Sequence, residues 1–355
     1  MSNPPFRIGA TNDEVFKRLS TDDAVHRTLA AAANVELATF PEAGLVGPGL
    51  LDDFDAVIAG GFRITPESTA GIERCAAIVR YGAGYDLVDL DACTEAGIIL
   101  ATTPVGVRRP VATAALTYIL TLSTRILCKS KFIYDGQWAQ SKKSENNGIG
   151  LTGKTIGLVG FGGIGRDLAG LIKPFAMRRL VYDPYIDEQT ARDRDVQLVD
   201  LSALMSESDF VITLCALTGQ THHLIGEAQL RLMKPSAFFI NVARGPIVDQ
   251  KALTRVLAER RIAGAGLDVF DPEPIEPGDP ILELDNVLLT PHCLAVTDEM
   301  VQSCNELSLA AALAVMRGEL PDSVINRPVL DSPKLQARLK AYSAACGSEK
   351  GIAGA

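Results

Sequence analysis

Short apolar runs alternate with amphipathic segments along the first part of the chain, and this pattern predicts a small α/β unit with a parallel sheet. A helix is expected over residues 24–33. Thr65 is placed to cap another helix, with Pro66 at its first position. The expected strands are Phe6–Ala10, Val35–Leu37, Asp55–Ala59, Ala76–Arg80 and Ile98–Leu100.

The alternation resumes after a boundary at residues 102–104 and an Ala/Leu/Thr-rich helix expected over residues 111–127. The polar residues 135–150 indicate a surface excursion. Residues 298–316 predict a long helix that returns to the first domain. Beyond Asp331, one amphipathic turn set (Leu335, Leu339 and Tyr342) precedes Gly/Ser/Ala-rich sequence that is expected to fray. The expected strands here are residues 155–159, 180–182, 210–214, 237–242, 264–268 and 287–289.

A glycine-rich turn follows the first of these strands. Thr155–Val159 leads into a G-x-G-x-x-G sequence, then a helical pattern, a second apolar run and Asp183. This order is the dinucleotide-binding fingerprint. Gly160 permits the tight turn, Gly162 lets a pyrophosphate approach the backbone, and Gly165 lets the helix pack close to the strand. Asp183 would accept hydrogen bonds from ribose hydroxyls. A turn that binds nothing is the alternative, which the flanking strands and the acid disfavour.

Three ionisable side chains follow later strands of the same predicted sheet. Because ligands bind outside the carboxyl ends of parallel strands, Arg244, Glu273 and His292 are expected on the edge that carries the glycine turn. A histidine can carry a proton at physiological pH, and a paired carboxylate favours its protonated form. An arginine fork suits a carboxylate and a carbonyl. Taken singly, each residue is more simply a surface or packing residue. The pair His222–His223 is interpreted as structural, and no metal site is predicted.

Length, composition and charge narrow the class of protein. Because single cores stop growing at about 250–300 residues, a chain of 355 residues predicts two domains. A net charge of −9 does not predict the positively charged surface that binds nucleic acid or an anionic membrane. Residues 111–127 carry threonines and Arg125 and are interpreted as a packed helix, and the first residues do not resemble a signal peptide. Seven cysteines without a C-x-x-C pair favour a reducing cytoplasm over a disulfide framework.

The chain resembles the D-isomer-specific 2-hydroxyacid dehydrogenases, which include glyoxylate/hydroxypyruvate reductases and phosphoglycerate dehydrogenases. The matching stretches, in the family's order, are Val79–Asp86, Gly153–Asp183, Asn241–Gly245, Asp268–Pro274 and Thr290–His292. The resemblance implies two Rossmann-like or flavodoxin-like α/β domains with parallel sheets and a cleft between them. Residues 1–103 plus 298–330 would form the substrate-binding domain, residues 104–297 the dinucleotide-binding domain, and residues 331–355 a C-terminal tail. It also implies a homodimer formed through the nucleotide domain.

The resemblance further implies which residues carry the function. Arg244, Glu273 and His292 would be catalytic, and backbone N–H groups around Gly82–Gly84 would hold a substrate carboxylate. The residues expected to bind substrate are Tyr81, Gly82, Ala83, Gly84, Arg244 and His292. The residues expected to bind NAD are Gly160, Gly162, Gly163, Ile164, Gly165, Asp183, Ala216, Thr221, Val242, Ala243, Arg244, Asp268 and His292. Departures from the family pattern occur at Leu87, at Ala216 and at Cys293–Ala295.

The leading hypothesis is an NAD-dependent enzyme that interconverts a D-2-hydroxy acid and its 2-oxo acid. One alternative is a relative that oxidises formate or phosphite, although formate enzymes pair their histidine with glutamine, so Glu273 counts against that variant. Another is an NAD(H)-sensing protein like the co-repressors on this fold. Asp183 favours NAD over NADP, with Arg178 and Arg179 the cations that could reach the ribose. Other arginines (Arg63, Arg80, Arg108 and Arg109) could support a phosphorylated substrate, but a structural or solvated role is favoured.

Overall fold

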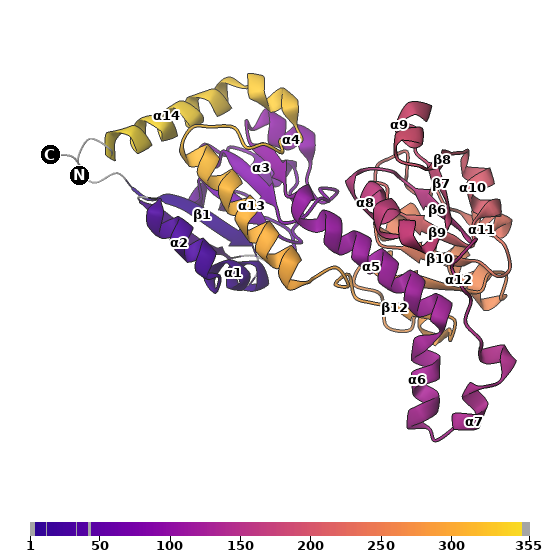
Figure 1. The fold of residues 1–355 in the computed structure, drawn as a ribbon. Coiled ribbons are helices and arrows are strands. Elements are labelled where there is room, and N and C mark those ends of the chain that lie inside the picture. The colour runs from indigo at the N-terminus through magenta and orange to yellow at the C-terminus, as the bar shows by residue number, and fades with distance from the viewer. Residues whose placement is uncertain (1–3, 12, 33, 42–43, 350–355) are drawn as a thin grey trace. The chain divides into compact units, whose positions relative to one another are not determined.

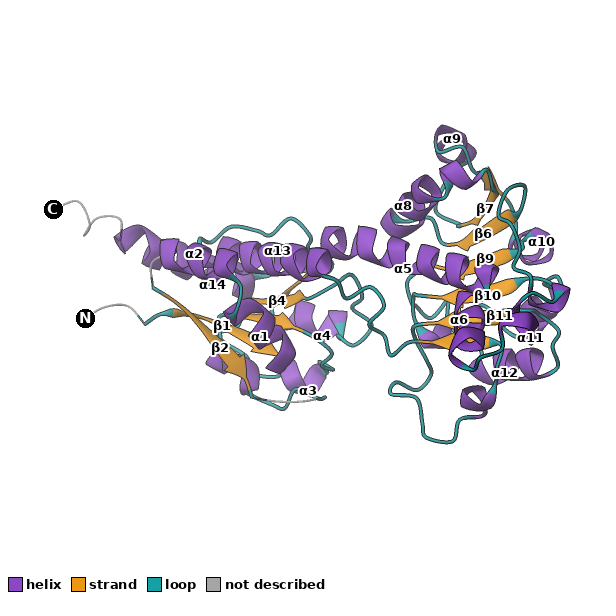
Figure 2. Cartoon of the chain, turned by 60° about the horizontal axis from the view of Figure 1, so that its bottom comes forward, coloured by secondary structure: helices purple, strands orange, loops and turns teal. Residues whose placement is uncertain are grey.

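The computed structural model describes residues 4–11, 13–32, 34–41 and 44–349. The chain divides into two compact units. Unit 1 comprises residues 1–107 and 297–355, and unit 2 comprises residues 108–296. Each unit is built on a parallel sheet with helices on both faces (Figures 1 and 2). The α/β class and the two parallel sheets expected from the sequence are therefore confirmed.

The sheet of unit 1 has five parallel strands in the order β2-β1-β3-β4-β5. This is the flavodoxin-like order. Strands β3, β4 and β5 are short, mostly apolar and buried, as is typical of parallel sheets covered by helices. The strands are β1 (Phe6–Thr11), β2 (Val35–Phe40), β3 (Ala56–Ala59), β4 (Ala77–Arg80) and β5 (Ile99–Thr102).

Alternate side chains of these strands enter two different cores. Ile8, Ile58 and Val79 point to the face that is covered by four helices of unit 1. Val57 and Ile78 point to the opposite face, which two short helices and their loops cover. The first group of helices is α1 (Asp13–Ser20), α2 (Asp23–Ala31), α13 (Asp298–Met316) and α14 (Pro333–Glu349). The second group is α4 (Leu90–Glu95), whose Cys93 lies in that core, and α3 (Pro66–Thr69), which packs against α4.

The C-terminal segment differs from the expectation of a single amphipathic turn set. Residues 333–349 form one continuous helix, α14, whose Leu335 joins the core of unit 1. Arg338 is 9% exposed, and its guanidinium donates hydrogen bonds to five backbone carbonyls. These bonds explain why the segment is ordered, because a buried cation is stable only when its donors are satisfied. The five carbonyls belong to Ile72, Glu73, Cys75, Ala96 and Gly97. Residues 350–355 lie outside the described part of the chain.

The sheet of unit 2 has seven parallel strands in the order β12-β11-β10-β9-β6-β7-β8. Counted from β6, this is the Rossmann order, with the reversal of strand order between β6 and β9. The strands are β6 (Thr155–Val159), β7 (Arg178–Tyr182), β8 (Gln197–Leu198), β9 (Phe210–Thr213), β10 (Phe238–Asn241), β11 (Gly264–Leu267) and β12 (Val287–Leu289).

Helices cover both faces of this sheet as well. Ile156, Leu158 and Ile212 pack with α5 (Pro104–Thr124), α8 (Gly163–Leu171) and α9 (Glu188–Asp193). Val211 and Phe239 pack on the other face with α10 (Leu201–Glu207), α11 (Glu227–Leu232) and α12 (Gln250–Ala258). The unit is completed by α6 (Ile126–Tyr134) and α7 (Trp138–Ser141), which project from its sheet-and-helix body (Figure 1).

Several predicted helix bounds are corrected. The helix expected over residues 111–127 begins at Pro104, where proline is favourable in the first turn, and ends at Thr124. It ends there because Arg125 is left-handed, with φ +54°, and α6 follows at an angle of 57°. The helix expected over residues 24–33 is α2, and Ala33 lies outside the described residues. Within the described ranges no single helix has the length and apolar character to cross a bilayer; only the bent pair α5–α6 passes that test, by length and composition.

Candidate active site

The glycine turn lies between β6 and α8, at the point where the strand order of the unit 2 sheet reverses. Gly160 has φ +101°, and a Cβ there would lie 2.6 Å from the backbone nitrogen of Cys215, so only glycine fits. A Cβ on Gly165 would lie 2.6 Å from the Gly160 carbonyl oxygen, so glycine lets α8 approach the turn. Nothing lies within 4 Å of a Cβ built on Gly162. The turn thus leaves space above the first N–H groups of α8, as a pyrophosphate would require. Ile164 lies in the first turn of that helix and packs into the core.

Asp183 follows β7 and reaches back to the same turn. Its Oδ2 accepts a hydrogen bond from the Phe161 N–H at 2.7 Å, and its Oδ1 accepts one from Tyr185 N–H at 2.9 Å. Each carboxylate oxygen has a second lone pair, so both can still accept a ribose hydroxyl. Arg178 and Arg179 are engaged elsewhere. Arg178 pairs with Glu207 at 2.7 Å, and Arg179 pairs with Asp195 at 2.5 Å.

The loop after β9 contains two of the residues expected near the cofactor. The Thr221 hydroxyl donates to the Ala216 carbonyl at 2.6 Å and accepts from the Thr218 N–H at 2.7 Å. These bonds close the loop at the carboxyl edge of the sheet. Directly after the neighbouring strand β10, Val242 is buried and Ala243 N–H donates to the Asn241 side chain. Thr221 therefore shapes its own loop through its hydroxyl.

Arg244 stands at the carboxyl end of β10, held through its main chain. Asn241 Nδ2 donates to the Arg244 carbonyl at 2.9 Å, and the guanidinium Nη1 donates to Ala243 O at 2.8 Å. The next residue, Gly245, lies directly against the loop after β11. A Cβ on Gly245 would lie 1.8 Å from Phe270 O, so no larger residue fits there. This contact joins the loop of Arg244 to the loop that carries Glu273.

Glu273 and His292, predicted to pair, are hydrogen-bonded. His292 Nδ1 lies 2.8 Å from Glu273 Oε2, and Phe270 N–H donates to Glu273 Oε1 at 2.8 Å. Burial opposes ionisation of Glu273, but its hydrogen bond to His292, the His292 charge, the Phe270 N–H and the Arg244 charge together outweigh that effect, so the pKa of Glu273 lies below its ordinary value. With Nδ1 turned to the carboxylate, Nε2 is the ring nitrogen available for a substrate.

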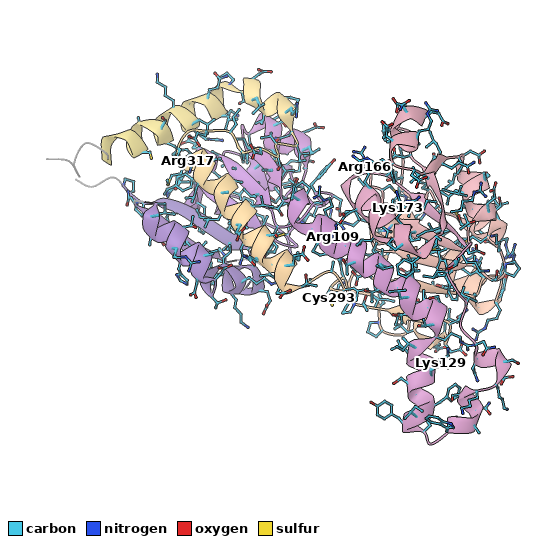
Figure 3. The ribbon with its side chains drawn as sticks, in the orientation of Figure 1. Arg109, Lys129, Arg166, Lys173, Cys293 and Arg317 are labelled. Carbon is cyan, nitrogen blue, oxygen red and sulfur yellow. The ribbon has the colours of Figure 1, made fainter. Side chains whose placement is uncertain are left out.

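Asp268 directly follows β11 and is buried, with 5% of its surface exposed. Its Oδ1 accepts hydrogen bonds from Thr290 Oγ1 at 2.5 Å and from the Cys293 and Leu294 N–H groups at 3.1 Å each. These donors lie on both sides of His292, in the loop after β12 where Figure 3 labels Cys293. The sequence suggested Asp268 as a cofactor residue. The structure shows that one of its oxygens holds the turn at residues 290–294, which carries His292.

The four remaining residues of the expected substrate site lie in unit 1, in the turn after β4. Gly82 has φ +133°, and its N–H donates to Thr103 Oγ1 at 2.7 Å, so this N–H is already engaged. The Tyr81 hydroxyl lies 3.0 Å from the Val301 carbonyl and 2.9 Å from Asn305 Oδ1. Among the described residues, the main-chain N–H groups of Ala83 and Gly84 have no hydrogen-bond acceptor within the protein. Thr103 and Asn305 carried no motif in the sequence that could have identified them.

Arg80 and Arg109, two of the four arginines suggested for a phosphorylated substrate, and the histidine pair have structural contacts. Arg80 is 8% exposed and donates to the Gly84 and Ala59 carbonyls. Arg109 pairs with Asp167 of α8 at 2.9 Å; Figure 3 labels Arg109 on α5. The rings of His222 and His223 are stacked with centroids 4.1 Å apart. In the described ranges no group of three or more His, Cys, Asp or Glu residues is arranged to hold a metal ion.

Comparisons with known proteins show what the chain is similar to. A family model described as the NAD-binding domain of the D-isomer-specific 2-hydroxyacid dehydrogenases matches residues 116–293. A glyoxylate reductase of Korarchaeum cryptofilum is 38% identical over 254 residues, which are 71% of this chain and 76% of that protein. A D-3-phosphoglycerate dehydrogenase of Methanocaldococcus jannaschii is 36% identical over 326 residues, which are 90% of this chain but 60% of that longer protein. The crystal structure of a glyoxylate reductase from Paecilomyes thermophila has a TM-score of 0.79 at 28% identity, covering 92% of this chain and 100% of that chain.

Proposed function

Because this chain belongs to the D-isomer-specific 2-hydroxyacid dehydrogenase family, we propose that it interconverts a D-2-hydroxy acid and its 2-oxo acid with NAD(H), using His292 as the proton donor and acceptor. The chain is an oxidoreductase with an NAD-binding domain, and this much follows from its family. The observation that supports the residue assignment is the 2.8 Å bond between His292 Nδ1 and Glu273 Oε2.

The proposed proton step follows from that bond. When bound, the nicotinamide cofactor supplies or accepts the hydride. In the direction of reduction, His292 Nε2 donates a proton to the oxygen of the 2-oxo group, while Glu273 stabilises the imidazolium through Nδ1. In the direction of oxidation, neutral His292 removes the hydroxyl proton. Arg244 would hold the carboxylate or the carbonyl oxygen with its planar fork of donors.

The substrate carboxylate is assigned to the turn after β4. Gly82 N–H is engaged by Thr103, so Ala83 and Gly84 supply the N–H groups that we assign to the carboxylate. The named relatives make glyoxylate the first substrate to test, followed by larger 2-oxo acids. Arg80 and Arg109 have protein partners, which supports an unphosphorylated substrate.

The proposed cofactor is NAD. Asp183 stands where a 2′-phosphate would lie, and a carboxylate beside that phosphate is a like-charge contact. The two nearby cations, Arg178 and Arg179, are already paired with Glu207 and Asp195. We expect a higher kcat/KM with NADH than with NADPH, and a shift toward NADPH in Asp183→Ser. Equal kcat/KM for both cofactors in the wild type would overturn this assignment.

The proposed reaction is tested by adding a panel of 2-oxo acids to the protein and NADH. NADH should be consumed with at least one of them, and a prochiral 2-oxo acid should give the D-hydroxy acid. The matched control is His292→Ala, which should still bind NADH but turn over poorly. A wild-type protein that binds NADH and reduces none of the panel would favour an NAD(H)-sensing protein.

We propose a homodimer as the assembled form, with α6 and α7 as the surface that meets a second copy. This surface carries large apolar side chains that are more than half exposed, and none of the α6 residues is buried. Apolar patches of this kind mark protein interfaces. The residues are Ile126, Leu127, Ile133, Tyr134 and Trp138.

Light scattering on the full chain tests the homodimer. The wild type should have the mass of two chains, and Leu127→Glu should shift the protein toward the monomer. Glu is placed here at an exposed position, so the fold of the subunit should persist. A monomeric wild type would overturn the proposal.

The proposed compartment is the cytoplasm. All seven cysteines are unpaired, which fits a reducing environment.

A further inference from the structure

A tyrosine hydroxyl inside the apolar core of unit 2 has one polar partner in the loop of the candidate acid–base pair. Tyr118 on α5 is fully buried, and its ring packs on β11, where a Cβ on Gly266 would lie 2.5 Å from the ring. Its hydroxyl lies 2.5 Å from Thr290 Oγ1. A buried hydroxyl costs free energy unless it is hydrogen-bonded, so this contact is the one that justifies a tyrosine at this position.

The hydrogen bonds from Tyr118 run in one direction. Thr290 Oγ1 lies 2.5 Å from Asp268 Oδ1, and an ionised carboxylate can only accept. Thr290 therefore donates its single proton to Asp268, and it accepts the proton of Tyr118. Burial raises the pKa of Tyr118, even though its bond to Thr290 acts in the opposite sense, so the phenol stays protonated and remains a donor at any working pH.

The chain of bonds ends on both sides of His292. Asp268 Oδ1 accepts from the Thr290 hydroxyl before the histidine and from the Cys293 and Leu294 N–H groups after it. His292 itself has φ +50°, a left-handed conformation that a non-glycine residue holds only when its surroundings enforce it. The hydrogen bonds to Asp268 hold the turn in this conformation, and Thr290 links Asp268 to Tyr118 on α5.

We propose that Tyr118 is a positioning residue for the acid–base pair: through Thr290 and Asp268 its hydroxyl fixes the turn that places His292 against Glu273. The inference rests on the proposed role of His292 and adds a residue far from it in sequence. Tyr118 touches neither the histidine nor its partner, so it acts only through the turn. Without the Tyr118 hydroxyl, Thr290 and Asp268 would lose their link to α5, so the imidazole could move away from Glu273 and the proton transfer would start from a poorer geometry.

The test is Tyr118→Phe, which keeps the ring and removes only the hydroxyl. A single lost hydrogen bond should lower kcat about three- to tenfold in both directions. The dissociation constant for NADH should stay within about twofold. Because the pairing with Glu273 is loosened, the alkaline limit of reduction should move to lower pH. Glu273 is bonded to His292, Arg244 acts electrostatically on Glu273, and Asp268 and Cys293 lie in the bonds that hold the turn, and the substitution alters none of these groups.

A matched control separates positioning from general stability. The Tyr342 hydroxyl in unit 1 donates to the Arg74 carbonyl at 2.6 Å from a mostly buried ring. Tyr342→Phe therefore loses a comparable bond, and it should lower the melting temperature without changing kcat or the pH profile. If Tyr118→Phe behaves as Tyr342→Phe does, its hydroxyl is merely structural and the proposal is wrong.

Variants of Thr290 provide a second route. Thr290→Ser keeps the hydroxyl and should retain the wild-type pH profile, whereas Thr290→Val keeps the shape and should lose kcat at least as much as Tyr118→Phe. Equal kcat in Thr290→Val and wild type would overturn the proposal even if Tyr118→Phe failed to fold. His292→Ala separates the proposed role of His292 from the proposed role of Tyr118. An active His292→Ala enzyme would refute the proposed proton carrier, whereas an inactive one beside a fully active Tyr118→Phe would refute only the positioning role.

Discussion

The turn at Gly82–Gly84 in unit 1 and the turn at Gly160–Gly165 in unit 2 both follow an interior strand of a parallel sheet. Both require a glycine with positive φ, +133° at Gly82 and +101° at Gly160. They differ in what comes next. The second turn leads directly into α8, whereas the first leads through an extended loop to α4, which begins at Leu90.

This difference suggests different anions for the two turns. A turn that enters a helix adds the partial positive charge of the helix terminus to several N–H groups, which suits a diphosphate. A turn without a helix offers only separate N–H groups, which suit the smaller carboxylate. The neighbouring side chains differ as well. The sheet edge of unit 2 carries Arg244, Glu273 and His292, whereas the first turn is held by the Thr103 hydroxyl and by Arg80, whose guanidinium donates to the Gly84 carbonyl.

The largest expected effect comes from removing the proton carrier at the unit 2 edge. His292→Ala should lower kcat by about 10²–10⁴-fold, the usual contribution of general acid–base catalysis. NADH binding should change little, because the glycine turn and Asp183 remain intact. Stopped-flow fluorescence of NADH binding beside steady-state turnover measures both. Comparable losses in binding and turnover would show that the histidine serves the cofactor rather than the chemistry.

Removing the arginine should cost slightly less. Arg244→Ala should lower kcat/KM for the 2-oxo acid by about 10²–10³-fold, by analogy with the loss of an oxyanion donor. The loss should be similar at all pH values, since the guanidinium does not titrate in the working range. Arg244→Lys keeps the charge but not the fork and should recover only part of the activity. Full recovery in that variant would mean that charge alone is needed.

The features that could be predicted from the sequence are those with a local pattern. The strands, the turn at Gly160 and Asp183 follow from apolar runs and glycine spacing. The pairing of Glu273 with His292 followed from the rule that strand ends meet at one edge, and the 2.8 Å bond confirms it. Their roles in catalysis stay a proposal.

Other features depend on contacts between distant segments and carry no local signal. Tyr118 and Thr290 are 172 residues apart in the chain, and a tyrosine in an Ala/Leu-rich helix is first read as core. The order of α14 depends on Arg338, whose carbonyl partners lie in loops at residues 72–75 and 96–97. The apolar pattern therefore predicted too short a helix, because a charged residue, Arg338, anchors α14 to unit 1.

The comparison of the two turns is tested by placing alanine in each. Gly160→Ala combines backbone strain with a Cβ 2.6 Å from Cys215 N, so it should destabilise the protein by about 2–6 kcal/mol and impair NADH binding. Gly82→Ala meets only Val107, at 4.0 Å, so it should cost about 1–3 kcal/mol from strain alone. Denaturant unfolding gives both values.

Ligand binding distinguishes the two variants more clearly than stability does. Gly82→Ala should raise KM for the 2-oxo acid while leaving the NADH dissociation constant unchanged, and Gly160→Ala should weaken NADH binding. If both variants weakened NADH equally, the assignment of one turn to the carboxylate and the other to the diphosphate would be wrong.

The smallest effect is a shift along the pH axis on removing the charge of Glu273. Because the pKa of Glu273 lies below its ordinary value, the carboxylate is ionised at neutral pH and loses its charge only as the pH falls through that lowered pKa. Its contribution to the folded state is thus present above the unfolded pKa and is lost in acid. At neutral and alkaline pH the charge favours the imidazolium form of His292.

Glu273→Gln keeps the shape and one hydrogen-bond acceptor but removes this preference. Reduction needs the protonated ring, so its alkaline limit should move to lower pH. Oxidation needs the neutral ring, so its acid limit should move in the same direction by the same amount, extending oxidation into more acidic solution. Profiles of kcat/KM against pH in both directions measure the two shifts independently. Because one group governs both, unequal shifts would contradict the pairing, as would unchanged profiles, whereas equal shifts with an unaltered NADH affinity would assign the proton step to His292 with Glu273 as its partner.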